Sequence, residues 1–333
     1  HAGALLGIAE MLLSGTTTFC DGYFFESEVG RAAIEAGMRG IIAQGFIDFG
    51  APDQMAHSEK ALIARRFVER WNDRSPLITP ALVCHSPYTC SPETLRNVKA
   101  AANRLGVPFQ IHLSETREEV DLLRSRYGKK PLEHLHELDI LDENTIAAHC
   151  IWLDPSEIGL IAENGVKVAH DPESNMKLGA GVAPVTEMLR RGIDVGLGTD
   201  GCASNNDLDL FGEMRTAANL HKVFTGDPTV MKAEKVVELA TIGGARVLGM
   251  EDRIGTVTPG KEADLILVDM KKPHLTPLYH PFSHLVYAAC GADVKTSIVG
   301  GKIVMKDRRL IQMDVGTVMA EVRQIASQIK RSR

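Results

Sequence analysis

Apolar residues along this chain occur in short runs of strand length, separated by longer segments in which apolar positions recur every three or four residues. Short runs rich in β-branched residues favour strands, whereas the second spacing places apolar side chains on one face of a helix. The two patterns alternate, which predicts a parallel sheet with helices packed outside it. The expected strands span residues 16–21, 40–48, 77–85, 108–113, 145–150, 166–170 and 193–200.

Capping residues indicate where several helices begin and end. Ser91-Pro92-Glu93 supplies an N-cap, a proline at the first helical position and an acid near the positive end of the helix dipole, and Gly106 ends that helix. Asp154-Pro-Ser-Glu157 has the spacing of a capping box. Further helices are expected at residues 2–13, 28–36, 58–71, 116–127, 131–138, 184–191, 207–224 and 231–248.

Polar residues stand at the carboxyl ends of the expected strands. In a (β/α)8 barrel the active site is built at that end of the strands, whereas a doubly wound sheet gathers its ligands at one switch point. The distribution therefore favours an α/β fold of the (β/α)8 or TIM-barrel type, with the doubly wound sheet as the alternative. Seven strands are counted, one fewer than a closed barrel needs. The strand-end residues are Asp21, Asp48, His85, His112, His149, His170 and Asp200.

The pattern changes near Arg253, where a turn-rich segment is followed by runs typical of antiparallel strands. These runs span 263–269, 297–299 and 302–305, and a last helix is expected at 316–330. We therefore expect two units. Residues 1–252 would form a hydrolase barrel holding strands 2–8 of eight, and residues 253–333 a small β appendage with the C-terminal helix.

Composition narrows the class of protein. Of the 333 residues 44% are apolar and 24% charged, as in ordinary globular proteins, and no apolar run approaches the roughly 20 residues of a membrane span. The net charge is −6 without any basic run, so we expect no nucleic-acid partner and no membrane partner. Six cysteines without a C-x-x-C pair favour a reducing, cytoplasmic location.

Four of the polar groups form a chemically coherent set. His112 with Glu115, His149 and Asp200 follow successive strands, so they should meet at the barrel mouth. Two imidazoles and two carboxylates suit a metal-dependent hydrolase, because a divalent ion lowers the pKa of bound water from about 16 to about 7 and carboxylates move protons. The alternative is that each group is an isolated polar residue at a strand end.

Short motifs spread over nearly the whole chain resemble the amidohydrolase superfamily, in particular its branch of methylthioadenosine/S-adenosylhomocysteine deaminases, chlorohydrolases and guanine deaminases. Each motif alone is weak, but together they are specific. They are Ser14-Gly-Thr-Thr-Thr18, His85-Ser-Pro-Tyr88, Ile111-His-Leu-Ser-Glu-Thr116, Ala147-Ala-His-Cys150, His170-Asp-Pro-Glu-Ser-Asn175, Gly198-Thr-Asp-Gly201 with Ser204-Asn-Asn206, and Gly260-Lys-Glu-Ala-Asp264.

The resemblance implies a role for each candidate residue. His112 and Asp200 would be ligands of one divalent metal ion, zinc in the first place, with iron or manganese as alternatives. Glu115 would protonate the ring nitrogen beside the attacked carbon, and His149 would position the hydroxide. Asp200 would also take the proton of the water and pass it to departing ammonia. His85, Glu115 and His149 would contact the substrate.

Two features depart from the family pattern. The family's first strand carries His-x-His, but the one such pair here, His134-Leu-His136, lies in an expected helix, where residues two apart face different ways. We therefore expect the first strand to precede His1, and a site with two instead of three protein ligands to bind metal poorly. Where relatives accepting S-adenosylhomocysteine place an arginine, this chain has Gln44, which favours a less charged substrate.

These observations lead to one functional hypothesis with two alternatives. We expect a metal-dependent hydrolytic deaminase of an adenosine-type nucleoside, namely methylthioadenosine, 5′-deoxyadenosine, adenosine or S-adenosylhomocysteine. The first alternative is a chlorohydrolase or guanine deaminase of the same superfamily. The second is an N-terminally truncated, non-catalytic binding or scaffold protein. The partner is expected to be a small-molecule substrate, and a homo-oligomer is possible.

Overall fold

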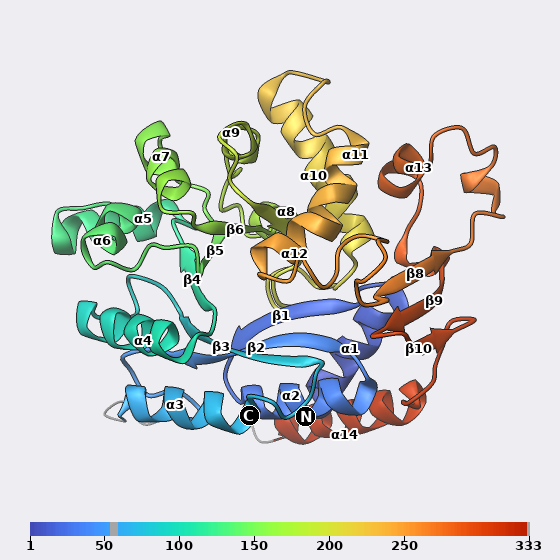
Figure 1. Ribbon diagram of the computed structural model, residues 1–333, viewed down its shortest axis with the longest axis horizontal. Coiled ribbons are helices and arrows are strands. Elements are labelled where there is room, and N and C mark those ends of the chain that lie inside the picture. The colour runs from blue at the N-terminus through green and yellow to red at the C-terminus, as the bar shows by residue number, and fades with distance from the viewer. Residues whose placement is uncertain (54–58, 332–333) are drawn as a thin grey trace.

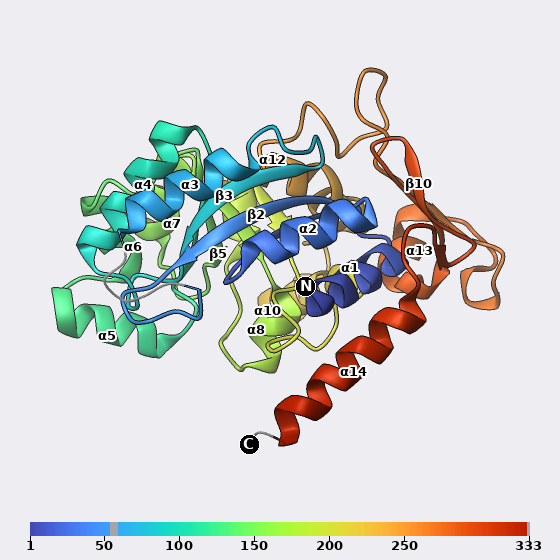
Figure 2. The same ribbon diagram turned by 90° about the horizontal axis from the view of Figure 1, so that it is seen from below.

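Seven strands form one parallel sheet in the computed structural model, which describes residues 1–53 and 59–331. The sheet is curled, and helices cover its outer side (Figures 1 and 2). Each strand pairs with the next along the chain, in the order β1 to β7. The strands are β1 Thr18–Tyr23, β2 Arg39–Phe46, β3 Ile78–Cys84, β4 Phe109–Leu113, β5 Thr145–His149, β6 Lys167–His170 and β7 Val195–Leu197.

The strand order decides between the two candidate architectures. A doubly wound sheet reverses its order at a switch point, and no reversal occurs among the described strands. The sheet is therefore of the barrel type, as the sequence predicts. Its ladders run from β1 to β7, and within the described residues no ladder joins β7 back to β1. β7 is shorter than predicted, since it ends at Leu197 and leaves Asp200 in the following loop.

The predicted helices form in the predicted order with small differences at their ends, and the short helix α8 is an additional one that was not expected. The Ser91 cap and the Asp154 capping box form as expected, and Gly106 ends α4 in a left-handed conformation. The predicted start at Ser58 lies outside the described residues, and α3 begins at Lys60. The helices of this part are α1 Ala2–Ser14, α2 Glu26–Ala36, α3 Lys60–Trp71, α4 Pro92–Leu105, α5 Arg117–Tyr127, α6 Pro131–Glu137, α7 Pro155–Glu163, α8 Pro172–Lys177, α9 Val185–Arg190 and α10 Leu210–Thr225.

The helix predicted at 231–248 consists of three consecutive segments. They are α11 Ala233–Glu238, a π-helical stretch at Leu239–Gly243 and α12 Gly244–Val247. The wider turn lies against β7, where a Cβ added to Gly196 would stand 2.9 Å from the Gly244 Cα. Glycine on both sides therefore permits a close approach of the two backbones.

A second, antiparallel sheet stands beside the first, with strand order β11-β10-β9-β8. Its strand β9 begins three residues earlier than predicted, and both β11 and the short helix α13 lie where no element was expected. The last helix, α14, packs along α1 and runs out toward the C-terminus (Figure 2). The elements are β8 Leu265–Val268, α13 Pro281–Tyr287, β9 Val294–Val299, β10 Lys302–Lys306, β11 Arg309–Leu310 and α14 Val315–Arg331.

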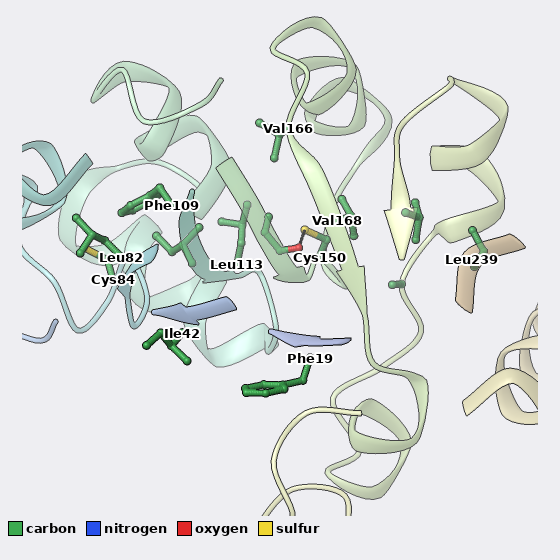
Figure 3. Close-up of a cluster of buried hydrophobic side chains, with 14 of the residues drawn as sticks. Phe19, Ile42, Leu82, Cys84, Phe109, Leu113, Cys150, Val166, Val168 and Leu239 are labelled. Atoms are coloured by element: carbon green, nitrogen blue, oxygen red, sulfur yellow. Dashed lines mark hydrogen bonds between the residues drawn. The ribbon is translucent and has the colours of Figure 1, made fainter. Parts of the chain in front are cut away.

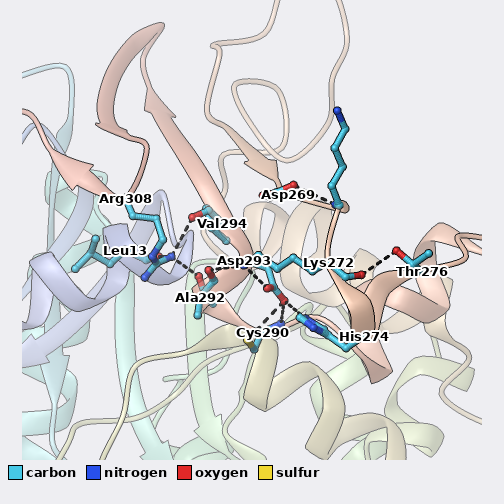
Figure 4. A network of polar contacts seen from close by, with 12 residues as sticks. Leu13, Asp269, Lys272, His274, Thr276, Cys290, Ala292, Asp293, Val294 and Arg308 are labelled. Atoms are coloured by element: carbon cyan, nitrogen blue, oxygen red, sulfur yellow. Dashed lines mark hydrogen bonds and ion pairs between the residues drawn. The ribbon is translucent and has the colours of Figure 1, made fainter.

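Polar side chains fasten α1 to the second sheet. Ser297 donates a hydrogen bond to the Leu12 carbonyl at 2.9 Å, and the Arg308 guanidinium donates to the carbonyls of Leu13 at 3.2 Å and Val294 at 2.9 Å (Figure 4). The hydrogen bonds to Leu12 and Leu13 satisfy carbonyls at the end of α1 that the helix itself leaves free. The second sheet is thus attached by hydrogen bonds as well as by apolar packing.

The core of the first sheet lies between its strands and the surrounding helices. Side chains such as Phe19, Ile42, Leu82, Phe109 and Leu113 pack there in one contiguous buried cluster (Figure 3). β2 is buried along its whole length, as expected for a strand covered on both faces. No helix among residues 1–53 and 59–331 is long and apolar enough to cross a membrane.

Candidate active site

Three imidazoles stand side by side at the carboxyl ends of neighbouring strands. His85 follows β3, His112 lies in β4, and His149 ends β5. The ring centroids of His85 and His112 are 5.1 Å apart, and those of His112 and His149 are 5.5 Å apart and nearly parallel. The parallel register, which pairs Leu113 with His149, brings these residues together.

The His112 ring has a fixed tautomer. Its Nδ1–H donates to the His85 carbonyl oxygen at 2.6 Å, so Nε2 carries the lone pair. Burial, and then the neighbouring His149, lower the pKa of His112, which favours the neutral imidazole. A backbone anchor on one nitrogen and a free lone pair on the other is the usual arrangement of a metal-binding histidine.

His149 is anchored from the other side of the site. Its Nδ1 donates to Asn175 Oδ1 at 3.0 Å and lies 3.5 Å from Asp171 Oδ2, while Nε2 lies 4.0 Å from Glu115 Oε2. Burial opposes the charged imidazole, but Asp171, Glu115 and Asp200 together raise the pKa of His149. The ring is therefore oriented so that Nε2 faces the Glu115 carboxylate.

Glu115 is held in place through its backbone. Glu119, at the start of α5, accepts hydrogen bonds from the Ser114 N–H at 3.1 Å and the Glu115 N–H at 2.8 Å. Burial raises the pKa of Glu119 to about 7. The Thr116 hydroxyl caps the same helix by accepting from the Glu119 N–H. The loop that carries Glu115 is thus fixed by two side chains that need not touch a substrate.

Asp200 lies three residues beyond β7. Its Oδ2 accepts a hydrogen bond from Ser174 Oγ at 2.7 Å, and its Oδ1 accepts from the Gly201 N–H at 2.6 Å. The Asp200 charge opposes the lowering of the His112 pKa by burial and contributes to the raised pKa of His149, so the three groups share one electrostatic environment. The backbone of Asp200 is left-handed, with φ of 58°.

His85 lies among hydroxyl groups and an aromatic ring. Its Nδ1 lies 2.9 Å from Thr89 Oγ1 and 3.2 Å from Ser86 Oγ, and Tyr88 meets the ring edge-on. Burial, and then His112, lower the pKa of His85 to about 4. The ring is only partly buried, which suits a group expected to contact a substrate.

The structure brings His85, His112, Glu115, His149 and Asp200 to one edge of the sheet and leaves other candidates outside. His134 is buried in α6 against Tyr127, whereas His136 on the same helix is exposed, so this pair does not act together. His170 is fully buried and pairs with His221 of α10, with 3.0 Å between the two Nε2 atoms.

The donor set fits part of a metal site. The Nε2 of His112 and the carboxylate of Asp200 are donors that suit a divalent ion. Across the part of the chain that the structure describes, no group of three or more His, Cys, Asp or Glu side chains is arranged to hold a metal. That His112 and Asp200 bind a metal together stays a prediction from the sequence.

Several residues of the site were not among the sequence candidates. Asp171, Ser174 and Asn175 come from the short helix α8 and the residue before it, and Glu119 comes from α5. The spacing Thr116-x-x-Glu119 is that of a capping box and could have drawn attention to Glu119. The other three lie in His170-Asp-Pro-Glu-Ser-Asn175, a motif that we noted for its family likeness alone.

The chain matches a known protein family over most of its length. A family model described as the amidohydrolase family matches residues 1–304. The chain belongs to the amidohydrolase family. The family and the sheet order agree, since related structures carry the same barrel-type fold.

Relatives of this amidohydrolase are similar over nearly its entire length. A 5-methylthioadenosine/S-adenosylhomocysteine deaminase of Syntrophobacter fumaroxidans is 52% identical over 98% of this chain and 75% of the relative. A 5′-deoxyadenosine deaminase of Methanothermobacter thermautotrophicus is 46% identical over 96% of this chain and 74% of the relative. This chain thus spans about three quarters of the length of these proteins.

Solved structures agree with the fold. An adenosine deaminase from Xanthomonas campestris, crystallised with bound zinc, superposes with a TM-score of 0.96 at 39% identity, over 99% of this chain and 75% of that one. The zinc-containing atrazine chlorohydrolase from Arthrobacter aurescens superposes with a TM-score of 0.89 at 23% identity, over 96% of this chain and 75% of that one. At that identity the second likeness concerns the fold alone.

Proposed function

We propose that this amidohydrolase is a divalent-metal-dependent deaminase of adenosine-type nucleosides, which converts the amino-substituted ring carbon to a carbonyl and releases ammonia. The observation that carries the proposal is the 52% and 46% identity to proteins named as deaminases of methylthioadenosine, S-adenosylhomocysteine or 5′-deoxyadenosine, over nearly the whole chain. The geometry at the strand ends supports this proposal, because it gathers groups that can donate and accept protons at one edge of the sheet.

We propose zinc as the metal, since the similar adenosine deaminase contains it. His112 Nε2 and the Asp200 carboxylate would hold the ion. When bound, a divalent ion makes water a nucleophile at neutral pH. That the two ligands suit such an ion follows from the tautomer of His112 and from the Ser174 hydrogen bond that orients Asp200.

The side chains of this chain would move the protons. Glu115 would donate a proton to the ring nitrogen beside the attacked carbon, which lets that carbon accept the oxygen. Asp200 would take a proton from the attacking water and deliver it to the departing ammonia. His149, with Nδ1 anchored on Asn175, would direct Nε2 toward the attacking oxygen. His85 would contact the substrate at the edge of the site.

The environment of Gln44 bears on the substrate's tail. Gln44 lies in β2, is buried, and donates a hydrogen bond to Asp53 Oδ2 at 3.0 Å. A neutral amide beside a carboxylate does not favour an anionic group in the same place. We therefore propose methylthioadenosine, 5′-deoxyadenosine and adenosine as better substrates than S-adenosylhomocysteine.

A deamination panel tests this function. The zinc-loaded protein is incubated with the four nucleosides, guanine and a chlorotriazine, and release of ammonia or chloride is measured. We expect activity on the nucleosides. Activity on guanine or the triazine alone would overturn the nucleoside assignment, and no activity with no gain from added zinc would favour a non-catalytic binding protein.

We also propose a cytoplasmic location, because all six cysteines are free thiols.

A further inference from the structure

One face of α10 is polar although it is buried. Glu213 and His221 are completely or almost completely shielded from solvent, and Thr216 lies between them at helical spacing. All three contact the last residue of β6 or the segment that follows it. Glu213 accepts from the Glu173 N–H at 3.2 Å, Thr216 donates to Glu173 Oε1 at 2.6 Å, and His221 pairs with His170. Buried polar groups cost free energy unless they are satisfied, so this face is built around that segment.

Glu213 differs from the other two because it also holds the loop after β7. The Asn205 side chain donates one hydrogen bond to Glu213 Oε1 at 2.7 Å and a second to the Thr199 carbonyl at 2.9 Å. Thr199 directly precedes Asp200. One buried carboxyl group therefore connects the loop that contains Asp200 with the segment that contains Ser174.

These contacts close into a ring around Asp200. From Glu213 the ring passes through Asn205 and Thr199 to Asp200, whose Oδ2 accepts from Ser174. It returns through Glu173, the neighbour of Ser174, to Glu213. We call this the Asp200 ring, and its members are Glu213, Asn205, Thr199, Asp200, Ser174 and Glu173.

The backbone of Asp200 needs such support. With φ of 58° it occupies the left-handed region, which is unfavourable for a residue with a Cβ and persists where surrounding contacts enforce it. Burial, and then the charges of Glu173 and Asp171, raise the pKa of Glu213 to about 9, so this side chain is uncharged at neutral pH. Glu213 can therefore support the loop without adding a second negative charge beside Asp200.

We propose that Glu213 is a positioning residue that sets the orientation of the Asp200 carboxylate through the Asp200 ring. It is no catalytic residue, because its completely buried side chain cannot touch a substrate. The proposal rests on the proposed function only in so far as Asp200 moves protons and binds the metal. Its geometric part concerns the two loops and holds for any substrate.

Glu213→Gln tests the proposal with little change in volume. The glutamine NH2 cannot accept a hydrogen bond as the second carboxyl oxygen does, so either the Asn205 or the Glu173 arm of the ring opens. We expect kcat to fall roughly 10- to 100-fold, as is usual when a group that orients a metal ligand is lost, with KM nearly unchanged. Hydrogen exchange of peptides covering 171–177 and 199–206 should become faster, and zinc affinity should fall.

Thr216→Val is the matched control. It removes a hydrogen bond from the same face of α10 to the same residue, Glu173, but leaves the Asp200 ring closed. We expect it to leave kcat within about twofold of the wild type. Thermal unfolding of both variants shows whether they are equally folded.

Two results would overturn the assignment. One is unchanged exchange at 199–206 in Glu213→Gln, which would mean that the ring does not hold this loop. The other is an equal loss of kcat in Thr216→Val, which would mean a general sensitivity of α10. If the wild type itself deaminates none of the nucleosides, the proposed substrate fails, while exchange and zinc affinity still decide the role of Glu213.

Discussion

The two nitrogens of His149 face different neighbours, and this asymmetry defines the chemistry of the site. Nδ1 is anchored on Asn175 with Asp171 close by, so Nε2 is the atom presented to Glu115. A proton donor must lie within hydrogen-bond reach of the atom that it protonates. In the proposed mechanism Glu115 is this donor, and the hydrogen bonds from the Ser114 and Glu115 N–H groups to Glu119 fix its backbone.

Glu115→Gln should remove the proposed proton donor without changing the fold. The amide keeps the shape of the side chain but has no acidic proton, so we expect kcat for nucleoside deamination to fall at least about 100-fold. Steady-state kinetics and zinc content are measured together, and zinc should remain bound. Glu118→Gln, at an exposed position on α5, is the control and should retain activity. Undiminished deamination by Glu115→Gln would disprove the proton-donor role.

The sequence could predict His85, His112, Glu115, His149 and Asp200 because each follows or ends a strand, and parallel strands end at one edge. It could not predict the contacts of Ser174 or Asn175, and for Glu119 it offered only the spacing of a capping box. Their importance depends on which atom of a neighbour they reach, and that is set by loop conformation. Left-handed φ values at Ser114, His149 and Asp200 are likewise invisible in residue identity, because these are not glycines.

At the scale of elements, β6 and α10 are joined by the buried pair His170 and His221. Burial, and then Lys222, lower the pKa of His221 to about 4 from an ordinary 6.5. Between pH 6.5 and pH 4 the unfolded chain therefore binds a proton at His221 that the folded chain does not bind. The stability that depends on the neutral His221 ring is complete above pH 6.5 and is lost as the pH falls toward 4.

Replacing His221 should make unfolding less sensitive to acid. A shift from 6.5 to about 4 corresponds to about 3 kcal/mol at about 1.4 kcal/mol per pKa unit. The free energy of unfolding is measured in urea at pH 7.5, 6 and 5 for the wild type and His221→Gln, and the variant should show the smaller slope. His136→Gln, at an exposed position, should keep the wild-type slope. Parallel slopes for all three proteins would contradict the prediction.

A second link between elements joins α4 to the start of β5. The Lys99 ammonium is almost fully buried and pairs with Asp142, and it donates to Thr145 Oγ1 at 2.9 Å. Asp142 itself is partly exposed. Removal of Asp142 should therefore cost more stability than removal of Lys99, because only Lys99 would be left as an uncompensated buried charge.

Asp142→Asn should destabilise the protein by roughly 3 kcal/mol, and Lys99→Met by clearly less. In the second variant the Asp142 carboxylate can turn to water, and the apolar side chain fills the space of the lysine stem. Urea unfolding of the two variants and the wild type gives the comparison. Equal losses of stability would mean that solvent reaches Lys99 and that the pair acts as a surface ion pair.

The elements that the sequence could not predict are short. α8 has six residues and α13 seven, which is too few for an amphipathic pattern to repeat. β7 was predicted at 193–200, but strand pairing covers only Val195–Leu197, and Gly198-Thr-Asp200 belongs to the following loop. The alternation of long strands and helices, by contrast, was sufficient to predict the barrel-type sheet.

At the scale of the whole molecule, a buried ion pair joins the two sheets. Arg39 at the start of β2 is completely buried and donates to Asp264, just before β8, at 2.7 and 2.9 Å. Asp264 also accepts from the Gly300 N–H at 2.7 Å. The family-like motif Gly260-Lys-Glu-Ala-Asp264 therefore lies at the junction between the sheets.

Asp264→Asn should destabilise both sheets together. It leaves the partly exposed Glu262 as the one acidic partner of the buried Arg39 guanidinium, and we expect a loss of roughly 3 kcal/mol. Urea unfolding followed by fluorescence, with limited proteolysis in parallel, measures the effect. Glu262→Gln is the control and should cost no more than about 1 kcal/mol, because Glu262 is partly exposed. Equal stability of Asp264→Asn and the wild type would show that apolar packing alone joins the sheets.

The left-handed backbone at Asp200 also restricts how this enzyme can decay during evolution. A single nucleotide change turns an aspartate codon into one for asparagine, glycine, alanine, valine, glutamate, histidine or tyrosine. Of these, glycine and asparagine adopt a positive φ most easily, and valine least easily. Descendants that lose the activity but keep the fold should therefore carry asparagine or glycine at this position. That substitution would identify relatives that have lost catalysis.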